Sequence, residues 1–191
     1  EEEYPEWFGR NVEALKKVQP ELLKPEDISF VLGSTWIPVK YYQDFMYEKF
    51  ATSKHNRDSN IHIEFAEYTG TYFITEKRAE RDSIAANKTY GTERLNAYEI
   101  MEYTLNLKTV EVRDRQEYED PVTGEEKVRY VLNKRETLLA REKQAQIKME
   151  FESWLFAEPE RGAALTQLYN DRFNNIRPRT YNGCLLYTSD A

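Results

Sequence analysis

The segment IHIEFAEYTGTYFI at residues 61–74 has the sequence pattern of a β-hairpin. From Ile61 to Phe65 apolar and polar side chains alternate, which is the period of a strand with one buried face. A Thr69-Gly70 pair then supplies turn residues, and a second apolar and aromatic run follows it. The pattern predicts an antiparallel β-hairpin over residues 61–75.

A second hairpin is predicted over residues 109–132. Val110 and Val112 alternate with polar residues on its first strand, and we expect their side chains to point outward. The segment DPVTG at 120–124 is rich in turn residues, and apolar residues recur at every second position from Val128 to Leu132.

Helical spacing surrounds both hairpins. Apolar residues at intervals of three and four predict helices over residues 7–18, 25–32, 38–51 and 92–107, with a polar loop over 51–60. Gly33 fits a left-handed C-terminal cap for the second helix, and Thr92 fits the N-terminal cap of the fourth.

The longest helix is predicted after the second hairpin. Asn133, followed three residues later by Glu136, has the spacing of a capping box. The helix should run to about Ala157 and be followed by another that begins at Pro159. Its expected buried seam is Ala140, Ile147, Phe151, Trp154 and Leu155. Because strands and helices do not alternate as βαβ units, the predicted class is α+β: helices with two antiparallel β-hairpins and long C-terminal helices.

Composition narrows the class of protein. The 191 residues include 14 Tyr, 9 Phe and 3 Trp, which is too aromatic for a disordered chain. A single cysteine excludes both a disulfide framework and a multi-cysteine zinc site. No apolar run approaches the roughly 18 residues of a membrane span, so no membrane partner is predicted.

The two ends indicate a segment of a longer protein. The chain does not begin with Met, and residues 1–6 form an acidic linker. Residues 184–191, CLLYTSDA, share no pattern with what precedes them and resemble the translation of a transposase-end sequencing adapter. We therefore expect an internal fragment whose last eight residues are a non-biological tail.

No catalytic residue, cofactor site or metal site is predicted. The sequence has no phosphate-binding loop, no dinucleotide fingerprint and no nucleophile elbow. One alternative is a metal-dependent nuclease hairpin, in which Asp114 or Asp120 and Glu125 would hold the cation and Lys127 would stabilise the phosphate charge. An exposed, charge-rich hairpin tip is the preferred interpretation, because the chain is 32% charged and such spacings arise by chance.

Charge is distributed unevenly along the chain. Residues 1–133 carry 18 basic and 26 acidic side chains, a net −8, whereas residues 134–183 have a net charge of +2. The second segment offers side chains that could contact phosphates, and an aromatic ring that could stack on a base. These candidate DNA contacts are Lys134, Arg135, Arg141, Arg177, Arg179 and Tyr181. The alternative is an ordinary solvated helix face followed by a linker.

Three motifs carry a resemblance to a known family. They are LGSTWIP at 32–38, TYGTERLNAY at 89–98, and LYNDRFN at 168–174 followed by RPR at 177–179. Together they resemble a region of very large proteins of phages and conjugative elements. Those proteins join an adenine-specific DNA methyltransferase-like part to a Snf-type superfamily II helicase. The similarity runs from about Tyr4 to Gly183.

The resemblance implies a DNA-processing parent protein in the cytoplasm of a bacterial or phage-infected cell. Residues 7–133 would be an α+β accessory region and residues 134–183 a helical connector to a helicase that is missing here. The partners would be the adjacent helicase and methyltransferase-like domains of the same chain, and duplex DNA. ATP, Mg²⁺ and S-adenosylmethionine would belong to the parent. The alternative function is a structural or protein-interaction module without DNA contact.

Overall fold

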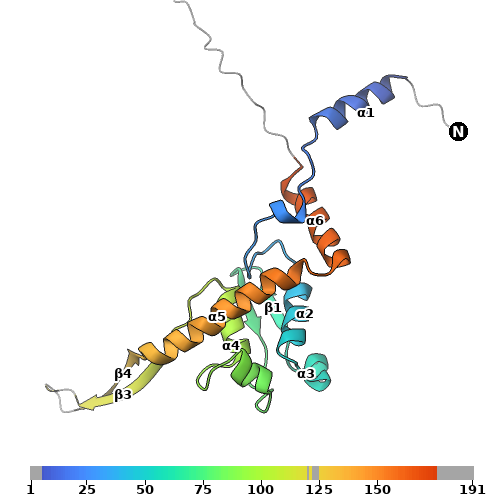
Figure 1. Cartoon of the computed structure of the whole chain (residues 1–191). Helices are drawn as coiled ribbons and strands as arrows, with labels where there is room; N and C mark the ends of the chain where they lie inside the picture. Colours follow the sequence, from blue (N-terminus) through green and yellow to red (C-terminus); the bar gives the residue numbers. More distant parts are fainter. Residues whose placement is uncertain (1–5, 120, 122–124, 176–191) are drawn as a thin grey trace, which may run out of the picture. The chain divides into compact units, whose positions relative to one another are not determined.

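The computed structural model describes residues 6–119, 121 and 125–175, which fall into two units (Figure 1). Of these residues, unit 1 comprises 6–28 and 163–175, and unit 2 comprises 29–119, 121 and 125–162. Unit 2 contains α2 (Val39–Lys49), α3 (Lys54–Ser59), β1 (Ile63–Ala66), β2 (Thr71–Ile74), the π-helix η2 (Ala85–Thr89), α4 (Ala97–Leu105), β3 (Arg113–Glu119), β4 (Glu126–Leu132) and α5 (Lys134–Leu155). Unit 1 contains α1 (Glu6–Val18), the 3₁₀ turn η1 (Pro25–Asp27) and most of α6 (Pro159–Phe173).

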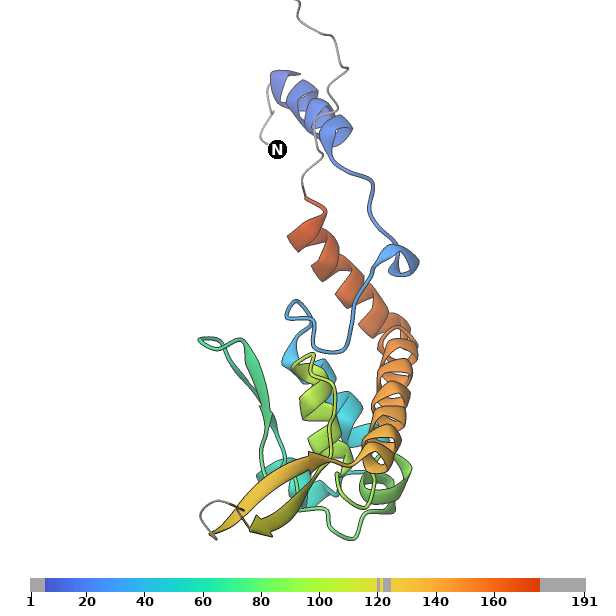
Figure 2. The same cartoon turned by 90° about the vertical axis from the view of Figure 1, so that its left-hand side faces the viewer.

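The predicted α+β class is confirmed. Both described sheets are two-stranded and antiparallel: β1 pairs with β2 and β3 pairs with β4. Ile63 lies opposite Ile74 in the first hairpin, and Arg113 lies opposite Leu132 in the second. In Figure 2, α4 lies between the first hairpin and α5, and it contacts both β2 and α5.

The core of unit 2 is an aromatic cluster between α2 and α5. The ring of Phe151 lies 5.2 Å from that of Phe45 and 5.3 Å from that of Tyr42, and Phe45 also contacts Trp154 at 5.5 Å. Ring pairs of this geometry add to the free energy gained from burial. All five residues of the predicted α5 seam are buried.

Polar side chains that periodicity did not single out complete the α5 interface. Gln144 is buried and donates from Nε2 to the carbonyl oxygen of Lys108 (2.8 Å), while its Oε1 accepts from the backbone N–H of Val110 (3.3 Å). Thr137 accepts from the N–H of Val112 (3.0 Å). These bonds hold the segment before β3 against α5, where Val110 and Val112 are buried. The expectation that they point outward from a strand is therefore wrong.

The predicted helix over 25–32 is also wrong. Only Pro25–Asp27 forms a 3₁₀ turn, and Ile28 is already extended. Further along, Gly33 (φ 106°) passes so close to α4 that a Cβ would lie 2.3 Å from the carbonyl oxygen of Leu105. The chain here crosses the end of α4 rather than following a helix cap, and this tertiary contact is invisible to local periodicity.

The fourth predicted helix begins later than expected. Asn96, not Thr92, caps α4: its side chain accepts from the N–H of Glu99, and Glu99 bonds back to the N–H of Asn96. Thr92 instead closes a turn with Leu95. Two short helices, α3 and η2, were not predicted, because α3 lies in the polar stretch 51–60 and η2 has no apolar period.

In unit 1, Asn170 holds the segment between α1 and η1. Its Oδ1 accepts from the N–H of Leu23 (2.8 Å) and its Nδ2 donates to the carbonyl oxygen of the same residue (3.0 Å). One turn later, Asn174 donates to the carbonyl oxygen of Glu21 (2.8 Å). The amides thereby pair the backbone of an extended segment as a neighbouring strand would.

Candidate nucleic-acid interface

Two neighbouring hollows of unit 2 gather cationic side chains. The first has a volume of about 580 Å³ and the second about 490 Å³, and both are lined by Asn87, Thr92 and Glu93. We call the two together the basic groove. Its cationic side chains are Arg78, Arg81, Lys88, Arg94, Arg135 and Lys143, and its acidic ones are Glu93, Glu99 and Glu136.

The 89–98 motif builds the wall that the two hollows share. Tyr90 donates from its hydroxyl to Glu150 on α5 (2.6 Å), which fixes the loop to that helix. Gly91 lies so close to η2 that a Cβ would be 2.3 Å from the carbonyl oxygen of Ala86. The Thr92 hydroxyl accepts from the N–H of Leu95 (3.1 Å) and donates to the carbonyl oxygen of Leu95 (3.2 Å). Each of these motif residues therefore has a structural reason for its identity.

The cap of α4 positions one arginine of the groove. Glu99 accepts from Arg78 (2.9 Å) through the carboxylate that also closes the capping box with Asn96. Asn96 in turn donates from Nδ2 to the carbonyl oxygen of Lys77 (2.8 Å), which holds the backbone beside Arg78. The position of this guanidinium group thus follows from the local folding of the helix start.

A second set of bonds holds the loop that carries Arg81. Asn87 on η2 donates from Nδ2 to the carbonyl oxygens of Glu80 and Arg81, both at 2.9 Å. The Glu80 carboxylate accepts from the N–H of Ser53 (2.7 Å) and from Asn56 (2.9 Å). Partial burial alone would raise the pKa of Glu80, but these hydrogen bonds outweigh it and hold the pKa below its usual value.

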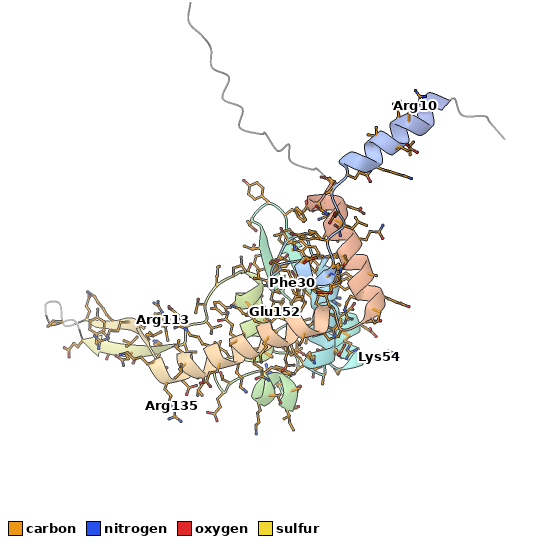
Figure 3. The ribbon with its side chains drawn as sticks, turned by 45° about the horizontal axis from the view of Figure 1, so that its top comes forward. Arg10, Phe30, Lys54, Arg113, Arg135 and Glu152 are labelled. Carbon is orange, nitrogen blue, oxygen red and sulfur yellow. The ribbon has the colours of Figure 1, made fainter. Side chains whose placement is uncertain are left out.

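The cations of the groove divide into two kinds. Arg94 pairs with Asp114 (3.1 Å), and Lys143 donates to the carbonyl oxygen of Thr89 (2.7 Å), so both are held by neighbours, as Arg78 is. Arg81, Lys88 and Arg135 are exposed, as Arg78 and Arg94 are, but no neighbour among the described residues holds their side chains. Figure 3 shows Arg135 projecting from the first turn of α5. Arg113 of the second hairpin lies on the opposite side of the start of this helix.

The arrangement suits a ligand that carries several negative charges. Guanidinium and ammonium groups bind phosphate oxygens, and spacing them along a groove matches a repeating phosphate backbone better than a single anion. The held cations would define the position of such a backbone, and the other three could adjust to it.

The structure places the predicted DNA contacts in different surroundings. Arg135 lines the basic groove, and Lys134 is exposed at the start of α5. Arg141 donates from Nε to the carbonyl oxygen of Val110 (3.1 Å), so it supports the segment before β3. Arg177, Arg179 and Tyr181 lie outside the described residues, as does the suggested tail at 184–191.

Sequence reasoning missed four basic residues of the groove, Arg78, Arg81, Lys88 and Arg94, because they belong to the segment whose net charge is negative. Their proximity to the 89–98 motif was the one available signal.

The nuclease alternative gains no support from the described residues. Asp114 is held by Arg94 and by Asn133, which donates to it at 2.8 Å. Within residues 6–119, 121 and 125–175 no three His, Cys, Asp or Glu side chains form a group able to hold a metal ion. Glu125 is exposed, and Asp120 lies outside the described part of the chain.

The described residues form an α+β module whose surface carries the basic groove. The chain belongs to the family described as "Domain of unknown function (DUF8437)", whose model matches residues 31–175. The match covers nearly all of unit 2 and the whole of α6. No curated protein and no solved structure matches the chain. No helix in the described residues has the length and apolar character needed to span a bilayer.

Proposed function

We propose that this chain is a non-catalytic accessory region of a large DNA-processing protein and that its basic groove contacts duplex DNA. The parent would join an adenine-specific DNA methyltransferase-like part to a Snf-type superfamily II helicase, in the cytoplasm of a bacterial or phage-infected cell. ATP and Mg²⁺, and S-adenosylmethionine, would act in those neighbouring parts, which are also the partners within the same chain.

One observation carries the DNA contact. In a protein of net charge −7, two adjoining hollows contain twice as many cationic as acidic side chains. An acidic protein is repelled by DNA as a whole, so a local cationic groove would set the orientation in which it approaches. The motif that resembles the methyltransferase–helicase family builds the wall of this same groove.

The test is the salt dependence of duplex binding. Binding to a short fluorescent duplex would be measured by anisotropy between low and moderate salt for the full chain and for the triple variant Arg81→Gln/Lys88→Gln/Arg135→Gln. These three side chains are exposed, so the variant keeps the Arg78 and Arg94 ion pairs. Each phosphate contact contributes about 0.9 to the slope of log K against log salt. We expect the slope to fall by about 2 to 3 in the variant.

A matched control separates the groove from net charge. Lys40, Lys54 and Lys148 are exposed lysines that do not line the groove, and changing all three to Gln alters the net charge equally. If both triple variants lose the same affinity, the effect is one of overall charge and the groove is not the site. If the unaltered chain shows no salt-sensitive binding, the DNA contact is wrong and the interaction-module alternative takes its place.

The parent is tested separately by the reading frame beyond Gly183. A Gly-Lys-Thr phosphate loop within a few tens of residues would support the methyltransferase–helicase assignment. An uninterrupted frame without such a loop would contradict that assignment while leaving the groove experiment valid.

A further inference from the structure

The outer edge of β4 has no partner strand among the described residues. Asn133 donates from its backbone N–H to the carbonyl oxygen of Val112 (2.9 Å), which fixes the phase of the antiparallel ladder. Because hydrogen-bonded and non-bonded pairs alternate, the N–H and C=O groups of Val128, Tyr130 and Leu132 point away from β3. An open row of donors and acceptors of this kind is a template for another strand.

The same three residues form an apolar row on one face of the hairpin. The exposed fractions are 44% for Val128, 66% for Tyr130 and 42% for Leu132. Figure 1 shows β3 and β4 extending past the N-terminal end of α5 as an isolated ribbon. A two-stranded ribbon with both faces in water is marginally stable, and adding strands is the usual remedy.

The sequence of β4 is complementary to itself when the strand is reversed about Tyr130. In that register Val128 lies opposite Leu132 of a second copy, and Tyr130 lies opposite its own counterpart. Two residues further out, Glu126 meets the second copy's Lys134, the first residue of α5. On the other face Arg129 lies opposite Val131, so no like charges face each other.

We propose that β4 pairs antiparallel with β4 of a second copy of this chain, about a two-fold axis at Tyr130. The two hairpins then form one four-stranded antiparallel sheet, and the isologous contact closes on itself as a dimer. The inference does not depend on DNA contact, and it gives Lys134 an anionic partner, Glu126 of the other copy.

The edge of β3 is less available for such pairing. Arg94 donates from Nη2 to the carbonyl oxygen of Arg113 (3.5 Å), so the start of that edge is already covered. The apolar row also belongs to β4, and pairing through β3 would leave it at the outside of the sheet. Both observations favour β4 over β3 as the strand that pairs with the second copy.

The first test reverses one charge of the interface and then restores the pairing with a second substitution. The measured quantity is the dimer dissociation constant of the full chain, determined by sedimentation velocity. Glu126→Lys places like charges opposite each other at both ends of the interface. Exposed pairs are worth little individually, so we expect the dissociation constant to rise about tenfold. Adding Lys134→Glu restores opposite charges and should return the constant to its original value.

The charge reversal should not destabilise the β3–β4 hairpin itself. Glu126 lies opposite Glu119 within one hairpin, a like-charge pair that Lys at position 126 would remove. Weaker dimerisation of Glu126→Lys therefore reports the interface rather than unfolding. If the double variant is no tighter than the single one, the register is wrong.

The second test removes the central apolar contact. Tyr130→Glu should abolish the dimer, whereas Phe73→Glu, at a residue of the first hairpin that is 50% exposed, should leave it unchanged. The interface is small, so micromolar dissociation constants are expected. A purely monomeric chain at about 100 μM would overturn the proposal.

Discussion

The hydroxyl of Tyr90 donates a 2.6 Å hydrogen bond to Glu150, and this bond joins the 89–98 loop to the middle of α5. Burial, followed by the effect of Glu150, raises the pKa of Tyr90 to about 12, so the hydroxyl keeps its proton. Partial burial opposes the charged form of Glu150, but bonds from Tyr90 and Gln146 and the charge of Lys49 (3.5 Å) outweigh it and lower its pKa.

The lowered pKa of Glu150 predicts a pH dependence of stability. A carboxyl whose pKa is lower in the folded state stabilises the fold fully above its unfolded value of 4.5, and the contribution is lost as pH falls through the folded value. We expect Glu150→Gln to lose about 1 kcal/mol of unfolding free energy near neutral pH. The difference from the unaltered chain should shrink below about pH 4.5 in urea titrations.

Glu152, an exposed residue of the same helix, provides the control. Glu152→Gln should change stability by less than about 0.5 kcal/mol, as is usual for surface substitutions. A Glu150→Gln deficit that persists undiminished at pH 3 would contradict the linkage argument.

Gly33 should tolerate no side chain. Its φ of 106° already disfavours any other residue, and an added Cβ would overlap the carbonyl oxygen of Leu105 at 2.3 Å. We expect Gly33→Ala to cost about 3 kcal/mol or more in chemical denaturation. Gly70, in the turn of the first hairpin, has φ 65° but open space around it, so Gly70→Ala should cost only about 1 kcal/mol. Equal costs would show that backbone strain alone explains both positions.

The buried amide of Gln144 should matter more than its neighbour at position 146. Gln144→Leu strands the buried N–H of Val110, and it removes a 2.8 Å bond to the Lys108 carbonyl oxygen. The expected loss is about 2 to 3 kcal/mol. Gln146→Leu removes one 3.0 Å bond to Glu150 from a half-buried site and should cost less than about 1 kcal/mol. Thermal unfolding of the two variants in parallel would reveal any reversal of this order.

Arg161 should not be replaceable by lysine. Its guanidinium group lies 3.6 Å from the ring centroid of Trp154, and it donates to the carbonyl oxygens of Trp154 (2.5 Å) and Leu155 (2.9 Å). A lysine keeps the charge but cannot make this planar, forked contact. We expect Arg161→Lys to cost about 1 to 2 kcal/mol by urea denaturation. Arg172→Lys, at an exposed position of α6, should be neutral, and similar losses in both would refute the stacking argument.

Local pattern was sufficient where an element buries one regular face. The α5 seam from Ala140 to Leu155 and the alternation around Ile63 were predictable because burial follows the period of the element. Pattern failed where distant contacts decide the conformation. The chain leaves helical conformation after Asp27, and it turns at Gly33, which lies against the end of α4. Val110 is buried where Gln144 and Arg141 bond its backbone.

The basic groove could not be predicted for a related reason. Its cations come from the 78–94 segment and from α5, which are separated by more than 40 residues and become neighbours only through the folded loop. Arg135 was found because it lies in a locally basic segment. Arg81 was not, since Glu80 and Asp82 flank it in the sequence and offset its charge.

The bonds between Leu23 and Asn170 have a consequence for synthesis. The two residues are 147 positions apart, so the ribosome must make all of unit 2 before the earlier segment meets its partner. At translation speeds of about 5–20 residues per second, the N-terminal segment waits roughly seven to thirty seconds. Unit 2 can therefore fold in the nascent chain before the contact between Leu23 and Asn170 forms.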